Sequence, residues 1–557
     1  MDRVIDALSR SHARALALLF VLSLAFFLPG QFTLQPMDRD EPRFAQASKQ
    51  MLETGDFVDI RFQDEARHKK PVGIYWLQSA AVAGAARLGL PDALTTIGYY
   101  RIPSLIGAVL AVWLTYWAAL AFLSRPGALL AAGLMAGCIL LGVEARLAKT
   151  DAVLTATVIA AMGALARVYA AHCRPGADNQ PGLGNALVFW VAVGIGILIK
   201  GPITPLIPLI VVVVLGVREW GLGWLRPLRP GLGLLIVAAI ALPWLVAIYL
   251  KSGGAFFTES VGKDMMGKVG GVAEKHWGPP GAYFFSFWAT FWPAAPLVVL
   301  SSWFAWRERG SDAVAFLLAW CLPMWVVLEF LPTKLPHYIL PLMPAIAILT
   351  VLAGERGILP GEGWRTRTGA ALMLLIPLGL MIGTPMAYWK LDGALPLAAM
   401  PLLGLAAVIA AFGARALLRA DLKAATVYGL LAALPLSVAA FRFGMPELQA
   451  INLSKRLVAM AQGERCQRPA YATSGYREPS LVFLTSTQLA MLSGIEVPGF
   501  LYATGGDCRI AFVEAREEAE FRRMTAPNQS DHRLVGRVKG ININGGRMLD
   551  IGVWIKR

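Results

Sequence analysis

Apolar runs long enough to cross a membrane recur along most of this chain and constrain its fold more than any other feature. The hydrocarbon core of a bilayer takes roughly 20 apolar residues as a helix. Such runs centre on residues 15–30, 72–90, 102–123, 127–143, 151–172, 185–200, 203–217, 231–250, 281–304, 312–331, 337–353, 369–388, 393–412 and 424–442. Only 16% of the residues are charged, whereas a soluble protein has about 25%. We therefore predict an all-α polytopic membrane protein rather than a soluble helical one.

Arginine-rich connections between the runs predict the topology and account for the net charge of +15. They lie at 218–229, 305–311, 354–368 and 413–423. Because such connections usually stay in the cytoplasm, we interpret the charge as topology and expect no nucleic-acid partner. The alternation is consistent if one run between residues 72 and 172 does not cross, and 127–143 is the best candidate. We expect about thirteen crossings, with the N-terminus cytoplasmic and the C-terminus outside.

The chain divides into a membrane domain, residues 1–445, and a polar region, residues 446–557, that has the composition of a soluble domain. In the polar region we expect a small α/β domain with strands at 470–473 and 509–513, a helix at 515–524 and a hairpin from 534–543 to 548–555. Cys466 and Cys508 both fall in this domain. They can pair if the domain lies outside the cytoplasm.

Two long connections, 31–71 and 251–280, face the outer side in this topology. Within the first, residues 41–52 have a mixed helical pattern, so we expect a helix lying along the membrane surface. The outer ends of the apolar runs also carry many acids and bases. These are Asp38 to Arg43, His68 to Lys70, Glu144, Arg146, Lys149, Asp151, Lys200, Lys263, Lys268, Lys275, His276, Lys334, His337 and Tyr338.

Ionisable residues at membrane depth are costly and are commonly functional. The alternative is that the lysines only anchor the helices at the head groups, which explains Lys263 and Lys268 well. A rim of acids and bases suits an anionic lipid, because cations neutralise a phosphate while a carboxylate handles a proton or a developing positive charge. The chain has no G-x-x-x-x-G-K-[ST] motif for a nucleotide. An activated substrate on the outer side is therefore expected to be membrane-borne.

Several blocks of sequence carry a resemblance to a known family. They are Asp40-Glu41-Pro42-Arg43-Phe44-Ala45, Gly55-Asp56-Phe57, Lys69-Lys70-Pro71-Val72-Gly73-Ile74-Tyr75-Trp76-Leu77, Lys149-Thr150-Asp151, Ile197-Leu198-Ile199-Lys200-Gly201-Pro202, His276-Trp277-Gly278-Pro279-Pro280 and Thr333-Lys334-Leu335-Pro336-His337-Tyr338. In this order they resemble the protein-O-mannosyltransferase-like C-type glycosyltransferases. One departure is Val72, where many members have a second proline. The C-terminal domain and its segment 475–483 resemble the bacterial branch that transfers aminoarabinose to lipid A.

The resemblance implies the membrane glycosyltransferase (GT-C) fold and a place in the bacterial inner membrane, with the C-terminal domain periplasmic. It implies transfer of a sugar, 4-amino-4-deoxy-L-arabinose, from undecaprenyl phosphate to lipid A, with inversion at the anomeric carbon. We expect a monomer. Two alternatives stay open: a transferase of the same family with another sugar or a protein acceptor, and a transporter or flippase of lipid-linked substrates.

The resemblance also suggests roles for particular residues. As catalytic carboxylates we expect Asp40 first, Asp151 second and Glu41 third. For the lipid phosphate we expect Lys70, with Lys69, Arg43 and Lys200 nearby, and we expect His276, His337 and Tyr338 to line the same chamber. No cofactor is firmly implied. A divalent metal on Asp38, Asp40 or Glu41 with His276 is possible, but nothing in the sequence fixes its geometry.

Overall fold

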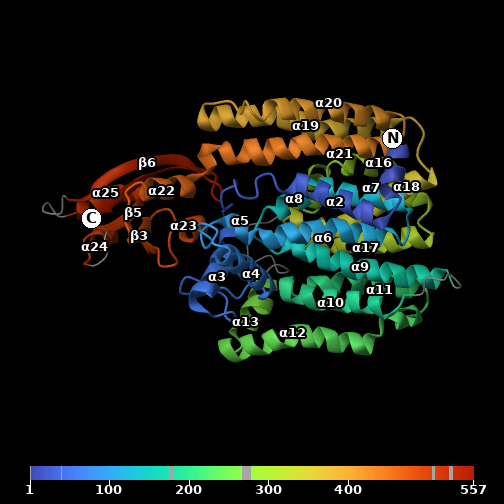
Figure 1. Cartoon of the computed structure of the whole chain (residues 1–557), viewed down its shortest axis with the longest axis horizontal. Coiled ribbons are helices and arrows are strands. Elements are labelled where there is room, and N and C mark those ends of the chain that lie inside the picture. The colour runs from blue at the N-terminus through green and yellow to red at the C-terminus, as the bar shows by residue number, and fades with distance from the viewer. Residues whose placement is uncertain are drawn as a thin grey trace.

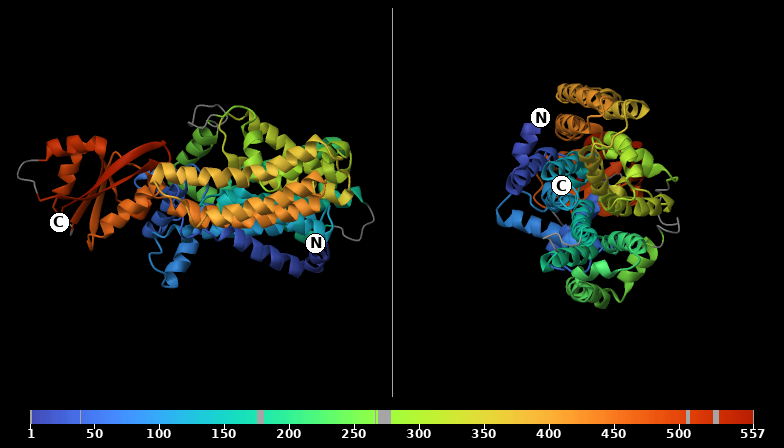
Figure 2. Two further views of the ribbon diagram at one scale, coloured as in Figure 1. Left: turned by 90° about the horizontal axis from the view of Figure 1, so that it is seen from above. Right: turned by 90° about the vertical axis from the view of Figure 1, so that its right-hand side faces the viewer.

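The computed structural model describes residues 2–38, 40–174, 181–265, 267, 278–504, 508–525 and 531–556. The molecule is elongated: long helices run side by side along its longest axis, and a domain of helices and strands built from the C-terminal residues caps one end (Figure 1). The N-terminus lies at the opposite end of the bundle, as Figure 2 shows. The all-α membrane fold and the small C-terminal α/β domain that we predicted are both confirmed.

The bundle consists mainly of long apolar helices. Its elements are α1 (Asp2–Ser9), α2 (His12–Phe27), α6 (Ile102–Ala119), α7 (Arg125–Gly137), α8 (Ile139–Ala145), α9 (Asp151–Cys173), α10 (Leu183–Lys200), α11 (Ile203–Arg218), α12 (Pro230–Ser252), α15 (Ala282–Thr290), α16 (Ala295–Arg307), α17 (Asp312–Phe330), α18 (Met343–Arg356), α19 (Trp364–Asp392), α20 (Met400–Leu418) and α21 (Leu422–Val438). Among the described residues nine helices are long and apolar enough to cross a membrane, or up to twelve if each of three bent pairs makes one span. With the shorter apolar helix α11, the set reaches the thirteen crossings that we predicted.

The run 72–90 stays outside this set, whereas 127–143, which we expected not to cross, forms a bent helix pair that is either a broken span or a re-entrant segment. Residues of the first run form α4 (Gly73–Arg87), which lies with the outer-loop helix α3 (Glu41–Thr54) at the end of the bundle near the C-terminal domain (Figure 1). The second run forms α7 and α8, which meet at a 61° bend. Helix α7 packs among α2, α6, α18 and α21. Its glycines and alanines look weakly apolar in sequence, but small residues let membrane helices approach closely.

Helix α9 lies at the centre of the bundle and carries Asp151 at its first residue. It packs against α6, α10, α11 and α17, and most of its residues are buried. Two glycines allow the approach of α6 to α9. A Cβ atom at Gly163 would lie 2.6 Å from the Trp117 ring, and one at Gly107 would lie 2.8 Å from the backbone of Val153. The position of Asp151 therefore depends on close contact between α6 and α9.

We expect Gly107→Val to destabilise the membrane domain by about 1–3 kcal/mol, because the added atoms overlap the backbone of α9 and force the two helices apart. Thermal unfolding of the purified protein in detergent measures the effect. The matched control is Gly84→Val on α4, where a Cβ atom meets nothing within 4 Å. Equal destabilisation by the two variants would show that helix propensity, rather than the contact between α6 and α9, is responsible.

Helix α3 forms where we predicted a helix, but it does not lie on the membrane surface. Its buried residues run from Glu41 to Met51, with Arg43 half-buried, and it packs between α4 and α23 (Pro479–Leu484) of the C-terminal domain. Gln46 Nε2 donates to Thr487 Oγ1 at 2.7 Å, and Lys49 Nζ donates to the Phe483 carbonyl at 3.2 Å. The polar face of this helix is therefore covered by protein instead of head groups.

The rest of the outer loop folds beside α3. It contains a short hairpin of β1 (Arg61–Phe62) and β2 (Glu65–Ala66), followed after α4 by α5 (Ile97–Tyr100). Gly73, at the start of α4, touches the end of α10: a Cβ atom there would lie 2.7 Å from the Leu198 carbonyl oxygen. This contact brings the Lys69–Lys70 end of the loop to the end of α10, where Lys200 is the last residue.

The C-terminal domain is a five-stranded mixed sheet with the strand order β4-β3-β5-β7-β6. Its elements are α22 (Leu453–Gln462), β3 (Pro469–Ser474), α23, β4 (Ala490–Leu492), α24 (Val497–Leu501), β5 (Cys508–Glu514), α25 (Ala515–Met524), β6 (Arg533–Asn542) and β7 (Arg547–Lys556). Strand β3 runs parallel to β4 and β5, and β7 runs antiparallel to β5 and β6. The predicted strands, helix and hairpin all form. A disulfide joins Cys466 to Cys508, with their Cα atoms 6.2 Å apart.

Candidate active site

Five buried or half-buried ionisable side chains meet near the end of α8, the start of α9 and the end of α10, on the side of the bundle that faces the C-terminal domain. We call them the buried charge cluster: Glu144, Lys149, Asp151, Lys200 and His337. Lys200 Nζ donates to Asp151 Oδ1 at 2.5 Å, and Lys149 Nζ donates to Glu144 Oε1 at 3.2 Å. His337 lies 3.7 Å from Glu144 and 3.8 Å from Asp151, measured from its ring nitrogens to their carboxylate oxygens. Two carboxylates thus face two ammonium groups, which is how a low-dielectric interior can hold charge.

Local structure explains why these side chains meet. Asp151 opens α9, and a carboxylate is stabilised by the positive end of the helix dipole. Lys200 closes α10, where a cation is favoured, and Gly201 ends the helix with a φ of +69° that disfavours other residues. His337 and Tyr338 come from a short 3-10 helix, η3 (Pro336–Leu342), that packs against α9. The Lys200 ammonium lies 5.1 Å from the centre of the Tyr338 ring.

Lys149 connects this cluster to the outer loop. Burial lowers the pKa of Lys149, but the charges of Glu144, Asp151 and Asp40 together hold this pKa well above its ordinary value. Lys149 therefore stays cationic throughout the physiological range. Asp40, half-buried at the start of α3, is close enough to Lys149 to contribute to this shift. The Asp40 carboxylate and the buried charge cluster thus belong to one electrostatic site.

We expected Glu41 as a third catalytic carboxylate, but in the structure it forms a buried ion pair with Arg101. Its side chain is 1% exposed and is held by Arg101, which is fully buried, through bonds of 2.7 and 2.9 Å. Glu41 also accepts from the backbone N–H groups of Met37 and Ala148, and Arg101 donates to the carbonyls of Gln31, Leu34 and Gln35. This ion pair ties the chain before Asp40 to the chain before Lys149. It positions the site and leaves no oxygen of Glu41 turned toward a substrate.

Asp38 also has a structural partner. Ser480 of the C-terminal domain donates to it twice, from its backbone N–H at 2.9 Å and from its hydroxyl at 2.6 Å. Burial raises the pKa of Asp38 to about 7, partly offset by the bonds from Ser480. Of the residues that we considered for a metal, Asp38 is bonded to Ser480 and Glu41 to Arg101. His276 lies outside the described residues.

We expect stability to fall as pH rises from about 4 to about 7, because the native Asp38 still binds a proton in this window while the unfolded carboxyl has lost it. Ionising the buried carboxyl then costs free energy that the unfolded chain does not pay. Thermal unfolding of the wild type and of Asp38→Asn at several pH values measures the effect. A pH dependence that is the same in both proteins would assign it to other groups.

The remaining sequence-predicted residues lie around this site. Lys69 is exposed, and Lys70 and Arg43 are half-buried; the contact of Gly73 with α10 places the two lysines on the Lys200 side. Arg67, which we did not single out, lies over the Phe44 ring at 4.9 Å, and Phe44 stacks on Tyr75. From the sequence, Glu144 was only one of the charges at the outer ends of the apolar runs, and Lys149 was also part of the Lys149-Thr150-Asp151 block. Arg101 was missed, although a lone arginine at the start of an apolar run was a usable signal.

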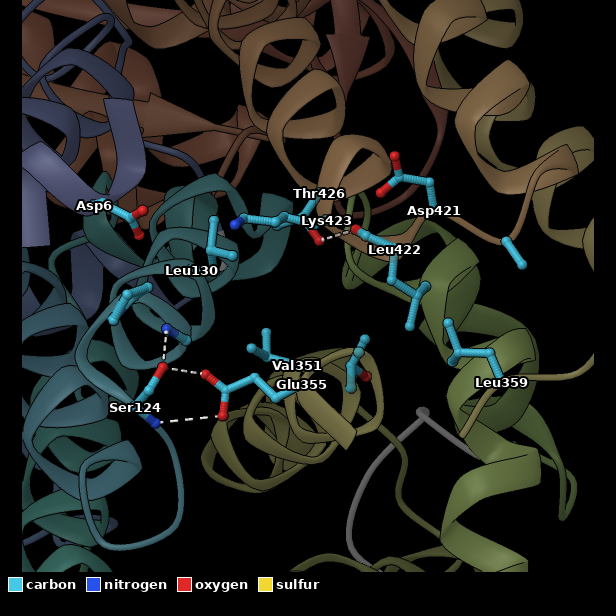
Figure 3. A pocket seen from close by; sticks show the side chains of 15 residues that line it. Asp6, Ser124, Leu130, Val351, Glu355, Leu359, Asp421, Leu422, Lys423 and Thr426 are labelled. Atoms are coloured by element: carbon cyan, nitrogen blue, oxygen red, sulfur yellow. Dashed lines mark hydrogen bonds between the residues drawn. The ribbon is translucent and has the colours of Figure 1, made fainter. Parts of the chain in front are cut away.

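A separate cavity of about 420 Å³ lies between α7, α18 and α21 (Figure 3). Two of its carboxylates have structural roles. Glu355 accepts from the backbone N–H and the hydroxyl of Ser124, which caps α7, and Asp421 accepts from the Ala424 N–H and caps α21. We interpret this cavity as a junction of helix ends. A second cavity, of about 590 Å³ and almost wholly apolar, lies between α4, α6, α9 and α10.

Three comparisons with known proteins agree with the resemblance predicted from the motifs. The profile of the family described as dolichyl-phosphate-mannose-protein mannosyltransferase matches residues 94–246. An undecaprenyl phosphate-alpha-4-amino-4-deoxy-L-arabinose arabinosyl transferase from Edwardsiella ictaluri is 28% identical over 404 residues, 68% of this chain and 66% of that protein. One of the same description from Yersinia pestis is 25% identical over 346 residues, 61% of this chain and 59% of that protein. The chain thus matches slightly less than two thirds of the length of these relatives.

The crystal structures of ArnT from Cupriavidus metallidurans, in the apo state and bound to undecaprenyl phosphate, are similar over almost their whole length. Each has a TM-score of 0.72 and 17% sequence identity, and the alignment covers 97% of this chain and 98% of the other. At this identity the likeness concerns the fold. The chain therefore has the ArnT fold from the first bundle helix to the C-terminal domain.

Proposed function

We propose that this chain, which has the ArnT fold, is an inverting glycosyltransferase that uses a sugar carried on undecaprenyl phosphate. The buried charge cluster carries the proposal, because it holds two buried or half-buried lysines beside the ends of apolar helices and near a loop that supplies a carboxylate. Ionisable residues in such places are costly and are commonly functional. The arabinosyl transferases from Edwardsiella ictaluri and Yersinia pestis support 4-amino-4-deoxy-L-arabinose as the sugar.

The reaction is a single displacement at the anomeric carbon. The bond from this carbon to the oxygen of undecaprenyl phosphate breaks, while a bond to an acceptor oxygen forms on the opposite face, so the configuration inverts. The leaving phosphate takes the electron pair and gains negative charge. Fixed cations stabilise such charge best in a water-poor site. We assign this role to Lys200 and Lys149, with Lys70 approaching from the outer loop.

The carboxylates then have separate roles. Asp151 is paired with Lys200 at 2.5 Å, so we assign it to holding that lysine in place rather than to taking a proton. Asp40 lies at the edge of the charged site and is the carboxylate left to face a substrate. If the acceptor is a hydroxyl, Asp40 takes its proton. If the acceptor is an already ionised phosphate, Asp40 orients it or binds the amino group of the donor sugar.

We propose lipid A as the acceptor and a monomer as the working unit, in the bacterial inner membrane with the N-terminus cytoplasmic and the C-terminal domain periplasmic. The Cys466–Cys508 disulfide supports this orientation, because such bonds persist in oxidising compartments. Mass spectrometry of lipid A from cells with and without the protein tests donor and acceptor together. A mass increase of one aminopentose is expected. An unmodified lipid A together with uptake of lipid-linked sugar into sealed vesicles would favour a transporter, and a different added mass would favour another sugar.

Among the described residues, one group of side chains could hold a divalent metal. Ligand atoms of Glu144, Asp151 and His337 all lie within 4.8 Å of one another, and oxygen and imidazole ligands suit several divalent ions. A bound ion would polarise a phosphate oxygen. Both carboxylates are already balanced by Lys149 and Lys200, so we propose that the lysines do this work.

On this basis, a strong chelator such as EDTA is expected to leave the transfer rate within about twofold of its starting value, because Lys149 and Lys200 already supply the positive charge at the phosphate. The rate of sugar transfer to lipid A, measured before and after dialysis against the chelator, provides the test. Loss of activity that is restored by one particular ion would place a metal on Glu144, Asp151 and His337 instead.

A further inference from the structure

A group of tryptophan and arginine side chains lies at the end of the bundle remote from the C-terminal domain; we call it the Trp–Arg cluster. It consists of Trp303 and Arg307 at the end of α16 and Trp364 and Arg365 at the start of α19, two helices that pack against each other. The Arg365 guanidinium lies 4.9 Å from the Trp303 ring centre and 4.7 Å from the Trp364 ring centre. Arg307 lies 5.8 Å from the Trp303 ring centre. Trp303 therefore contacts both guanidiniums, and Trp364 contacts that of Arg365.

The two arginines of the cluster have no acidic partner in the part of the chain that the structure describes. Arg218, by contrast, pairs with Asp312 at 2.9 Å. A ring that stacks on a guanidinium covers its flat face and leaves the N–H groups around its edge available. The free edge of a guanidinium matches the paired oxygens of a phosphate group. The positive charges of Arg307 and Arg365 are thus available to bind an anion and are not neutralised by an acidic side chain among the described residues.

The surroundings of the cluster indicate the kind of anion. Trp364 is 65% exposed, as is Trp306 next to the cluster at 66%, and tryptophan rings concentrate at the head-group level of membranes. We propose that the Trp–Arg cluster binds the phosphodiester head group of an anionic phospholipid. The arginines take the phosphate oxygens and the tryptophans lie against the glycerol and the upper acyl chains. This site is independent of the proposed transferase activity.

Native mass spectrometry of the full-length protein in detergent, titrated with phosphatidylglycerol, tests the proposal. The wild type is expected to bind phosphatidylglycerol more tightly than phosphatidylcholine. In Arg307→Gln/Arg365→Gln the affinity should fall roughly 25-fold, the product of about fivefold for each basic residue near an anionic head group. The matched control, Arg415→Gln/Arg419→Gln, removes the same charge from two exposed arginines at the end of α20 and is expected to change the affinity less than about twofold.

A third variant separates the aromatic rings from the charge. Trp303→Leu/Trp364→Leu keeps both arginines and should weaken phosphatidylglycerol binding about fivefold, because the guanidiniums lose the rings that hold them. Unchanged thermal unfolding in lipid-free detergent shows that each variant is folded. Equal loss in the cluster pair and the control pair would mean that overall surface charge attracts the lipid. Equal affinity of the wild type for phosphatidylcholine would also overturn the proposal.

Discussion

Replacing Asp40 with asparagine is expected to lower the rate of sugar transfer by about 100-fold or more while the protein remains folded, since a positioned proton acceptor typically contributes 10²–10⁴-fold. The substitution keeps the shape of the side chain and leaves the Asp40 carbonyl, which accepts from the Phe44 N–H, unchanged, so α3 should begin normally. It removes the negative charge that acts on Lys149 from the outer-loop side. The measurement is transfer from a synthetic undecaprenyl-phosphate-linked sugar to lipid A in detergent.

Asp64→Asn is the matched control for this experiment, because Asp64 is an exposed carboxylate in the turn of the same loop. It should transfer sugar at the wild-type rate. Comparing pH profiles separates the two roles of Asp40. If Asp40 takes a proton, the acidic limb of the wild-type profile disappears in Asp40→Asn; if it only orients substrate, the limb persists at a lower rate. Full activity in Asp40→Asn would remove this carboxylate from the mechanism.

Lys200→Met is expected to have the largest combined effect on stability and activity. Removing one partner of a buried ion pair leaves the other charge unpaired, which costs about 3–5 kcal/mol. The Asp151 carboxylate would lose its nearest cation, Lys200 at 2.5 Å, and would keep only Lys149 at 4.0 Å and the His337 ring at 3.8 Å. Sugar transfer should be lost as well, since the leaving phosphate loses a fixed positive charge.

The double variant Asp151→Asn/Lys200→Met distinguishes these two effects. It removes both charges, so thermal stability should return to near the wild-type value, while transfer stays lost. Lys390→Met, at an exposed lysine near the end of α19, controls for the loss of a surface charge. Recovery of transfer in the double variant would show that Lys200 serves only to neutralise Asp151. Continued instability would show that the pair is held for its hydrogen bonds rather than its charges.

Much of the fold could be predicted because membrane helices and surface strands follow local rules. The helix at 515–524 and the hairpin after it form with the predicted pattern, since each depends on neighbouring residues. Asp151, Lys200, His337 and Tyr338 were also predicted to share a site. Each stands at or beside the outer end of an apolar run, and the ends of neighbouring membrane helices lie at the same depth.

Contacts between distant parts of the chain could not be predicted in the same way. Glu41 was a candidate catalytic residue because nothing near it in the sequence shows that it pairs with Arg101, which lies 60 residues away. Asp38 was a candidate metal ligand because nothing near it in the sequence shows that Ser480, 442 residues away, donates to it. Helix α3 looked like a surface helix because polar residues usually face water or head groups, whereas here they bond to another domain. A buried ion pair and a covered polar face have no local signature.

The position of α3 against the C-terminal domain has a consequence for the order in which the protein is made. Residues 41–54 emerge from the ribosome early, but α23 and the residues that bond to Asp38, Gln46 and Lys49 lie more than 400 residues later in the chain. At about 5–20 residues per second, a ribosome needs roughly 20–80 s to bridge 400 residues. During that time the loop that carries Asp40 lacks the surface that holds it. A chain released before α23 is made therefore lacks the bonds that hold Asp38, Gln46 and Lys49 against the C-terminal domain.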